Sequence, residues 1–573
     1  MIIAEIPCPV NEISLCGSFK REWRTRKTGI KKHRLLTKFK IHFKFYSDLL
    51  QFAVKCGRIR SNNKRKDLIM SQLVTPDHLI EKRLRENNIA FKCFIVLLNL
   101  SFFVATPIAQ AITGVTGELF LSNLWDIFTG PSKLVTDYFA LGCLSSALFN
   151  AGLCGITCTL IITISRAHAN STTFAAYMLV IAHCFYGLNF INMWPPFIGV
   201  LIYCKLTGHS RRDNLHIAMF STALAPFISD FLFYYPPGEA LKIGEFSVLG
   251  IILSIVFGVL AGFLVPALLP GTTAMHRGYN MYKAGLAIGI LGIFVYCFLY
   301  KTLGIDTHST GPDIGSGYES FKSAHYLFIN AFFASIFLIA LILGFFRNGR
   351  SFRNYRKLTS CAGYGLDFAD KFGMPLCLIN FGVYGFCILA YLNIVFWLPT
   401  VFPFLPQGVG FTGPTVGVTF AALTFSADGQ HPKNVAPIAL GYTALFTLVC
   451  GLCLITDADI PWTLSTQAYI NGLAFATGLC PIAGSYGFKY GVIAGLVSAI
   501  ICTSTAAMHG GLVLYNGGFN AGLTAIILIP ILDFYKIKPK KIDTDEVYPI
   551  KGFEKDLIMK LVDRIEGRKK KSK

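Results

Sequence analysis

The feature that most constrains this chain is a series of apolar runs that are each long enough to cross a lipid bilayer. One helical span needs about 20 consecutive apolar residues. Such runs lie at about 91–113, 138–165, 214–235, 244–270, 283–303, 324–346, 372–398, 434–456, 480–503 and 517–535. Hydrophobic residues make up 53% of the chain and charged residues only 14%, which excludes an ordinary soluble domain. The sequence therefore predicts an all-α polytopic membrane protein whose helices contact the bilayer.

Two further apolar stretches are too long for one span and are interrupted by proline and glycine. They cover residues 172–206 and 399–427. Irregular backbone at membrane depth survives only where protein or a water-filled cavity satisfies its polar groups. We therefore expect each stretch to form a helical hairpin or a pair of half-helices, and residues 460–478 to form a further partial element. The expected total is about 10–12 transmembrane helices plus two helical hairpins or re-entrant segments.

The chain also contains an internal repeat, which is the first pattern to seek in any sequence. Its clearest part pairs Gly258, Ala261, Gly262, Thr272 and Ala274–His276 with Gly491, Ala494, Gly495, Thr505 and Ala507–His509, all at a constant offset of 233. A colinear series of this kind is hard to obtain by chance, even in a biased composition. The duplication predicts two membrane domains, at 85–303 and 318–535.

Weaker matches extend the repeat toward its beginning. Asp137 precedes Asn150 by the same interval as Asp367 precedes Asn380. We further pair Pro196, Gly199 and Val200 with Pro414, Gly417 and Val418, then Ile217 and Thr222–Leu224 with Ile438 and Thr443–Leu445, and, after a four-residue insertion, Ala284–Leu286 with Ala521–Leu523.

Positive charges indicate that the two repeats have opposite orientations. Cytoplasmic loops of membrane proteins carry an excess of Lys and Arg. Basic residues precede the first span (Lys82, Arg83, Arg85) and follow residue 346 (Arg347, Arg350, Arg353, Arg356, Lys357), whereas the loop 304–323 carries Asp306, Asp313 and Glu319. The spans 138–165 and 372–398 then run in opposite directions. We expect inverted-topology repeats in the plasma membrane, which is the inner membrane of a bacterial cell, with both termini cytoplasmic and a basic cytoplasmic tail at 536–573.

Residues 1–69 differ from the rest of the chain. They hold 17 Lys and Arg against 5 Asp and Glu, so +12 of the net charge of +21 lies there. They show neither apolar periodicity nor the three regions of a signal peptide. The segment is interpreted either as a disordered basic tail or as a translated leader that precedes a true start at Met70.

Glycines and asparagines gather within apolar sequence, most densely at His509–Ile526. In transporters built from inverted repeats, the solute binds near the midplane, where broken helices of the two halves meet. Glycine allows close approach to the backbone, and asparagine offers a donor and an acceptor without a buried charge. The candidate substrate-binding residues are Asn150, Asn280, Asn380, Asn516, Asn520, His276 and His509.

Structural alternatives exist for these residues and for the isolated charges. Buried asparagines can cross-link helices by hydrogen bonds, and the two histidines can lie at the membrane interface. We expect Asp137 and Asp367 to cap helix N-termini rather than to bind an ion. Three further ionisable groups in or near spans are functional candidates by default: His183, Asp230 and Lys489.

The favoured function is a secondary transporter or facilitator of a small polar or ionic solute, with a channel of urea-transporter type as the near alternative. A membrane-embedded enzyme is a second class, but the sequence has no HExxH, no matched GxSxG and no paired catalytic carboxylates, so we expect no enzyme activity. A membrane scaffold is a third class, because the tail at Arg568–Lys571 can contact anionic lipid. We expect no cofactor, metal or nucleic-acid partner, and we leave a homo-oligomer open.

The segments TDYFALG…FNAGL, WPPFIGV…KLTGHS…TALAP and AMHGGLVLYNGGFNAGLTA resemble a bacterial family of multi-spanning membrane proteins known only as domain of unknown function fifteen seventy-six. The resemblance covers about residues 85–545 and excludes the leader, which favours the start at Met70. It implies a multi-spanning fold and no activity. The shorter string YNGGFNAGL is weakly similar to the asparagine-glycine helices of urea transporters, and no residue roles are transferred from it.

Overall fold

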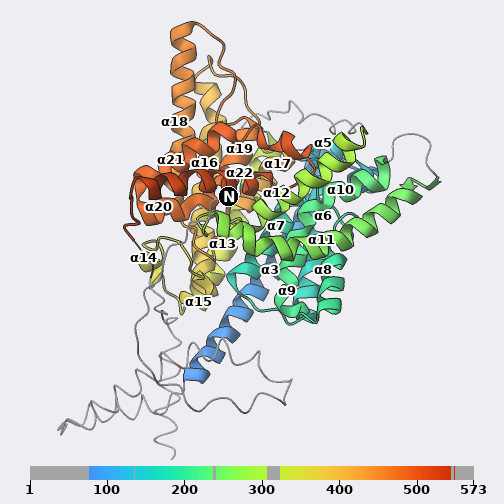
Figure 1. Ribbon diagram of the computed structural model, residues 1–573, viewed down its shortest axis with the longest axis horizontal. Coiled ribbons are helices and arrows are strands. Elements are labelled where there is room, and N and C mark those ends of the chain that lie inside the picture. Colours follow the sequence, from blue (N-terminus) through green and yellow to red (C-terminus); the bar gives the residue numbers. More distant parts are fainter. Residues whose placement is uncertain are drawn as a thin grey trace, which may run out of the picture. The chain divides into compact units, whose positions relative to one another are not determined.

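The computed structural model of the protein describes residues 76–134, 136–235, 241–305 and 323–541, together with Asp543 and Tyr548 (Figure 1). The segment 1–69, most of the loop 304–323 and most of the tail 536–573 lie outside the described residues. Within those residues, nine helices are long and apolar enough to cross a membrane, and the regular structure besides helices is one two-stranded hairpin. The predicted all-α polytopic membrane protein is therefore confirmed.

The first half of the described chain consists of helices and one antiparallel hairpin, in which Lys242 pairs with Ser247 and Ile243 with Phe246. Its elements are α3 (Pro76–Thr113), α4 (Gly117–Thr129), α5 (Tyr138–Leu141), α6 (Leu144–Ile164), α7 (Ser171–His183), α8 (Trp194–Thr207), α9 (Arg211–Ser221), the 3-10 turn η1 (Thr222–Leu224), α10 (Ala225–Ser229), the π-helical turn η2 (Asp230–Tyr234), β1 (Lys242–Ile243), β2 (Phe246–Ser247), α11 (Val248–Met275), α12 (Lys283–Tyr296) and the π-helical turn η3 (Cys297–Thr302).

The second half follows a similar order and is helical throughout its described residues. Its elements are α13 (Ala324–Arg347), α14 (Tyr355–Leu358), α15 (Phe368–Lys371), α16 (Met374–Val401), α17 (Gly413–Ala422), α18 (Pro432–Thr456), α19 (Gln467–Ala476), the 3-10 turn η4 (Thr477–Leu479), α20 (Cys480–Tyr486), α21 (Phe488–Ile501), the 3-10 turn η5 (Thr505–His509) and α22 (Asn516–Phe534). The two halves meet where α12 packs against α22, near the centre of the view in Figure 1.

The two broken stretches form short helices. Residues 172–206 give two short helices, α7 and α8, joined by a buried turn. They pack on different partners, α7 on α17 and α8 on α11, which fits the predicted pair of half-helices rather than a hairpin. Residues 399–427 give the end of α16 and the short helix α17. The expected span 480–503 is instead divided into α20 and α21 at Gly487, whose φ of 104° is a conformation that only glycine adopts readily. Helix α4 was not expected from the sequence.

Several long helices expose apolar side chains that only lipid can cover. In α11, the exposed residues include Leu249, Ile252, Ile255 and Leu260, and only 39% of its most apolar window is buried inside the protein. In α18 the buried share of that window is 22%. A soluble protein rarely exposes contiguous apolar surface of this extent. These faces therefore contact the bilayer, and the chain is a multi-pass membrane protein.

Glycines allow the close helix pairs within each half. Helix α8 packs on α11, and α18 packs on α21. A Cβ atom on Gly199 of α8 would lie 1.8 Å from the carbonyl oxygen of Gly258, and one on Gly441 of α18 would lie 2.3 Å from the carbonyl oxygen of Val492. Small residues are the usual means of bringing membrane helices together at this distance.

Matched contacts correct the correspondence between the halves. Asn150 donates to the carbonyl oxygens of Cys184 and Leu188, and Asn380 donates to those of Ser426 and Gln430. The interval from Cys184 to Ser426 equals the interval from Leu188 to Gln430, which matches α7 with α17. The sequence-based pairing of Pro196–Val200 with Pro414–Val418 was therefore wrong, because it matched α8 with α17.

Two other segments also pair differently from the sequence-based alignment. The 3-10 turns Thr222–Leu224 and Thr477–Leu479 each lead into a helix with proline at its second position, so Thr222–Leu224 does not correspond to Thr443–Leu445. Tyr282 and Tyr515 directly precede α12 and α22 and keep the offset of 233. The four-residue insertion is thus absent. The sequence-based alignment paired Ala284–Leu286 with Ala521–Leu523 because both strings read Ala-Gly-Leu, although they do not occupy equivalent positions.

The described contacts define two ends of the helical assembly. The Arg347 end carries the ion pairs of Arg347 with Glu86 and of Arg277 with Asp533. At the Trp125 end, Trp125 donates to Glu245, and the His325 ring contacts the Phe411 carbonyl. Helix α13 runs between the two ends, since His325 lies at its beginning and Arg347 at its end.

Candidate functional site

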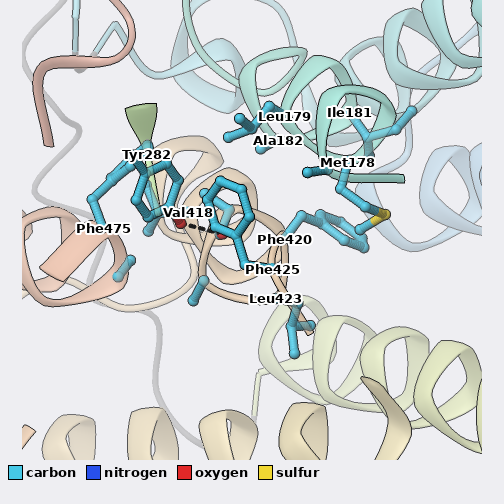
Figure 2. Close-up of a cluster of buried hydrophobic side chains, with 14 of the residues drawn as sticks. Met178, Leu179, Ile181, Ala182, Tyr282, Val418, Phe420, Leu423, Phe425 and Phe475 are labelled. Carbon is cyan, nitrogen blue, oxygen red and sulfur yellow. Dashed lines mark hydrogen bonds between the residues drawn. The ribbon is translucent and has the colours of Figure 1, made fainter. Parts of the chain in front are cut away.

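Two short helices, α7 and α17, pack against each other in the interior. With 13 and 10 residues they are only about 20 and 15 Å long, less than the ~30 Å hydrocarbon core. Polar caps fix where they begin, because the side chains of Asn170 and Thr412 accept from the backbone amides of Thr173 and Thr415. Figure 2 shows Leu179 and Ala182 of α7 on the side of Val418 of α17. The helices are close enough that a Cβ atom on Gly417 would lie 2.2 Å from the carbonyl oxygen of Ala182.

Each half supplies an aspartate to the N-terminus of the other half's short helix. Asp137 Oδ1 accepts from the Gly413 amide at the start of α17, at 2.9 Å. Asp367 Oδ2 accepts from the Ser171 amide at 3.3 Å and from the Ser171 hydroxyl at 2.7 Å, at the start of α7. Both aspartates also cap their own short helices, α5 and α15. The prediction of capping is confirmed, and the contact with the other half was not expected.

Asn150 and Asn380 hold the turns that follow α7 and α17. Both side chains are fully buried, and their amide groups donate to turn carbonyls at 2.7 to 3.0 Å. Each amide has two hydrogens, so these contacts engage both. The turns carry Tyr186 after α7 and Asp428 after α17. Asn150 and Asn380 therefore position these two residues; direct contact of either asparagine with a solute stays a prediction.

The loops before α12 and α22 cross between the halves in a reciprocal way. The Met281 amide donates to the Gly478 carbonyl in η4, and the Leu514 amide donates to the Ala223 carbonyl in η1, both at 3.0 Å. These bonds bring the next residues, Tyr282 and Tyr515, into the interior. Neither loop is regular helix at this point, because the Met281 and Leu514 amides donate to the 3-10 turns of the opposite half.

Tyr282 and Tyr515 differ in their hydrogen bonding. The Tyr282 hydroxyl donates to the carbonyl oxygen of Ala421, near the end of α17, at 2.6 Å. The Tyr282 ring lies beside Phe475 of α19 (Figure 2). The Tyr515 side chain is 1% exposed, and its hydroxyl has no hydrogen-bond partner among the described residues. A buried hydroxyl without a partner is unfavourable by about 1–3 kcal/mol, so it marks a place where a further group can bind.

A cavity of about 380 Å³ lies beside these rings. Aromatic and polar side chains line it, and the ones used below are Phe220, Tyr282, Phe425, Tyr515, His216, Thr172, Lys283 and Asp428. They come from α7, α9, α12, the turn after α17 and the loop before α22, and thus from both halves. A largely apolar pocket with a few polar groups, near the lower end of the usual ligand-site range of about 300–1,000 Å³, suits a small solute.

Asp428 is the one carboxylate among the described residues that line this cavity. Its Oδ1 lies 3.1 Å from the Ser171 hydroxyl. Burial, together with the nearby charge of Asp367, raises the pKa of Asp428 to about 7. Burial and the same neighbour raise the pKa of Asp370 in α15 to about 6. Asp428 is therefore poised between its neutral and charged forms near physiological pH.

A layer of packed rings adjoins the cavity at Tyr515. His183 lies 5.1 Å from Tyr515 and 6.1 Å from Phe475, measured between ring centroids. Tyr186, which contacts His183, is fully buried. The Phe185 carbonyl next to it accepts from the Tyr138 amide at the Trp125 end. The His183 and Tyr515 rings thus connect the wall of the cavity to this buried layer.

The remaining predicted site residues are buried near the cavity without lining it. Asn280 donates to the Gly518 carbonyl, and Asn520 donates to Ser498, with Asn520 Oδ1 unpartnered within the described chain. Asn516 Oδ1 lies 3.0 Å from His509 Nε2, and neither ring nitrogen of His276 has a partner in the described structure. The two histidines are fully buried. Whether any of these residues contacts a solute stays a prediction.

The isolated ionisable residues are dispersed. His183 belongs to the ring layer, Asp230 accepts from the Tyr300 hydroxyl, and Lys489 lies over the Tyr490 ring. The residues that the sequence interpretation missed are Tyr282, Tyr515, Lys283 and Asp428. The offset of 233 relates Tyr282 to Tyr515, so the repeat carried a signal for these two. Asp428 had a weaker signal, as an acidic residue after a broken apolar stretch.

Comparisons with known proteins leave the activity open. The model of one family, described as "Protein of unknown function (DUF1576)", matches residues 117–301 and 347–534. No curated protein and no solved structure matches the chain. The first matched range runs from the start of α4 into η3. The second runs from the end of α13 to the end of α22, so the two ranges cover both halves.

Proposed function

Since the chain belongs to the family described as "Protein of unknown function (DUF1576)", which assigns it no activity, we propose from its geometry that it is a secondary transporter of a small polar or ionic solute. The solute site is the cavity between the two halves. The observation that carries the proposal is that residues of both halves line one cavity and that packed rings adjoin it where α7 and α17 cross. We infer that it opens toward the Arg347 end, because Asp428 in its wall shares the Ser171 hydroxyl with Asp367, in the segment that follows Arg347. A site reached from one side at a time is what secondary transport requires.

The proposal includes an inverted topology of the two halves. The start of α6 lies near Asp137 at the Trp125 end, and the start of α16 lies near Asp367, which follows Arg347 in the chain. The reciprocal aspartate contacts and the reciprocal loop bonds of Met281 and Leu514 support two halves related by a pseudo-two-fold axis in the membrane plane. The basic residues after α13 favour a cytoplasmic Arg347 end in the plasma membrane.

The cavity offers three kinds of contact to a solute. The Tyr515 hydroxyl can donate or accept one hydrogen bond, because no described residue uses it. Lys283 presents a positive charge, and Asp428 presents a carboxyl group that can be neutral or charged. Phe220 and Phe425 exclude water from the wall, which strengthens polar contacts within. This combination suits a small solute that carries a charged or strongly polar group.

A channel is the second candidate, and the ring layer disfavours it. A channel needs a continuous path, whereas the buried rings of Tyr186 and Phe475 both contact the His183 ring next to the cavity. Exchange kinetics separate the two classes. A transporter moves labelled solute faster when unlabelled solute is present on the opposite side, and a channel does not.

The first experiment is a thermal-shift screen of metabolites on the purified protein, followed by uptake of each hit into proteoliposomes. Removing the Tyr515 hydroxyl in Tyr515→Phe should weaken binding of the solute about fivefold, the value of one ordinary hydrogen bond. Tyr535→Phe is the matched control, since Tyr535 lies beyond α22 and is 69% exposed. A protein that neither binds nor moves any solute, or a Tyr515→Phe variant with unchanged affinity, contradicts the proposed site.

A further inference from the structure

One hydroxyl lies between two carboxyl groups at the rim of the cavity. Ser171 Oγ is 2.7 Å from Asp367 Oδ2 and 3.1 Å from Asp428 Oδ1. A serine hydroxyl has a single hydrogen to donate. Both contacts can be full two-centre hydrogen bonds only if one of the two carboxyl groups carries a proton and donates it to Ser171 Oγ; with both ionised, the two oxygens share one hydroxyl hydrogen.

The proton belongs on Asp428 rather than on Asp367. Asp367 accepts backbone amides through both oxygens, from Ser171 at 3.3 Å and from Asp370 at 3.0 Å. Amide donors stabilise the ionised form of a carboxylate. Asp428 has no such amide contact among the described hydrogen bonds, and it lines the cavity, from which water can deliver and remove a proton.

The charges around Asp428 come from several elements. Asp367 and Asp370, at the start of α15, disfavour a second negative charge nearby, whereas Lys283 of α12 favours it. Arg83 of α3 acts on Asp370, and the thiols of Cys377 and Cys480 lie within electrostatic range. His216 of α9 lines the same cavity. The balance of burial and two carboxyl groups against one lysine raises the pKa of Asp428 to about 7.

A second residue of the cavity wall has a polar group without a hydrogen-bond partner in the described part of the chain. Tyr515 is 1% exposed, and its hydroxyl has no partner among the described residues. It lines the same cavity as Asp428. A solute and a proton can thus occupy one compartment, in which each changes the electrostatics felt by the other.

We propose that Asp428 is the proton-binding group of a proton-coupled transport cycle, an inference that rests on the proposed transport function. A hydronium ion in the cavity gives its proton to a carboxylate oxygen of Asp428, which forms an O–H bond and leaves one water molecule. Release reverses this step. The reaction needs no oxidant or reductant.

Protonation links the two halves directly. Protonated Asp428, in the turn after α17, donates to Ser171, the first residue of α7. Deprotonation removes this donor and places two carboxylates on one hydroxyl. Like charges at this distance repel strongly in a poorly solvated site, so the turn after α17 moves away from the start of α7. The proton therefore stabilises the arrangement seen here.

Infrared titration tests the proton site without any knowledge of the solute. The purified protein should show a protonated carboxyl band that disappears as pH rises through about 7, above the titration of Asp370 near 6, and Asp428→Asn should lack this higher-pH band. The amide introduced by this substitution keeps a donor toward Ser171, so the variant should fold. Asp126→Asn, which removes an exposed carboxylate in α4, is the control and should keep the band. A band that is absent from the wild type, or that persists in Asp428→Asn, overturns the assignment.

A second experiment tests the coupling. In proteoliposomes with a solute from the screen, an imposed pH gradient should accelerate uptake several-fold, and the ratio of rates with and without the gradient should fall to about one in Asp428→Asn. Acceleration by a sodium gradient instead contradicts proton coupling and leaves the transport function intact. If no solute moves while the carboxyl band titrates as expected, the transport function fails and the proton site stands.

Discussion

Tyr282 and Tyr515 hold the same position in the two halves, related by the repeat offset of 233, yet only Tyr282 has a hydrogen-bond partner for its hydroxyl among the described residues. The bond of Tyr282 to the Ala421 carbonyl closes the end of α17. Both residues line the cavity, and the buried hydroxyl of Tyr515 has no partner in the described part of the chain. Equivalent residues of the two halves thus differ in their hydrogen bonding.

The two tyrosines should respond differently to loss of the hydroxyl. Tyr282→Phe leaves the Ala421 carbonyl without its partner and should lower the free energy of unfolding by about 1–3 kcal/mol. Tyr515→Phe removes a hydroxyl for which the described structure offers no partner and should leave stability unchanged or slightly higher. Thermal unfolding of both variants in detergent measures the difference; equal destabilisation would show that the two hydroxyls are equivalent.

Close helix contacts predict a paired effect of glycine substitution. Gly262→Ala in α11 places a Cβ atom 2.1 Å from the Gly199 carbonyl carbon and should destabilise the protein by about 1–3 kcal/mol through overpacking. Gly271→Ala in the same helix meets nothing within 4 Å in the described structure and should change stability by less than about 0.5 kcal/mol. The melting temperatures of the two variants test this, and similar values would contradict the packing of α8 on α11.

The asparagines that hold the turns should be required for stability. Asn150→Ala leaves the carbonyl groups of Cys184 and Leu188 without the side-chain donor in a buried turn, which costs about 1–3 kcal/mol per unsatisfied group. Asn214→Ala, near the start of α9, removes a bond at the surface and serves as the control. The measurement is thermal stability together with solute affinity. Loss of affinity at unchanged stability would instead indicate direct contact of Asn150 with the solute.

Stability should fall as pH rises from about 4 to about 7. The folded-state pKa of Asp428 is about 7, above the ordinary value of 3.8, so the folded protein binds a proton that the unfolded chain has released in this window. The contribution is fully present below about pH 4 and is lost above about pH 7. Asp370, with its pKa raised to about 6, acts in the same direction. Unfolding temperatures across this range should slope less steeply in Asp428→Asn than in the wild type.

The orientation of the halves predicts opposite locations for two loops. Accessibility reporters in the loops 304–323 and 347–366 should appear on opposite faces of the membrane, because α13 connects the two ends. The loop 347–366 should be cytoplasmic. Labelling of both loops from the same face contradicts the inverted arrangement.

Particular residues show where the sequence was sufficient for prediction. The capping role of Asp137 and Asp367 followed from their place before matched spans, since a cap is a local interaction. The breaks at 172–206 and 399–427 followed from proline and glycine. The alignment of the middle of the repeat failed, because short strings such as Ala-Gly-Leu recur in apolar sequence, and only contacts such as those of Asn150 and Asn380 distinguish the alternatives.

The candidate site was harder to predict. Asparagines were predicted to bind the solute because amides are uncommon within spans. Two of them, Asn150 and Asn380, instead hold turns through side-chain hydrogen bonds to backbone carbonyl groups. Asp428 and Tyr515 gave little local signal. Their importance depends on Ser171 and on the wall of the cavity, which are contributed by segments far away in the sequence.

The sequence by itself determined that this chain crosses a membrane many times, and it predicted a duplication, because hydropathy and repetition are properties of the chain alone. The tertiary structure decided which segments of the duplication correspond, which polar groups are used in holding turns, and which line a cavity. The physical reason is that a buried polar side chain is defined by its partners. In this protein some of those partners lie in the same half, as for Asn150, and others lie in the opposite half, as for Asp137 and Asp428, so the roles of these residues appear only when the chain is folded.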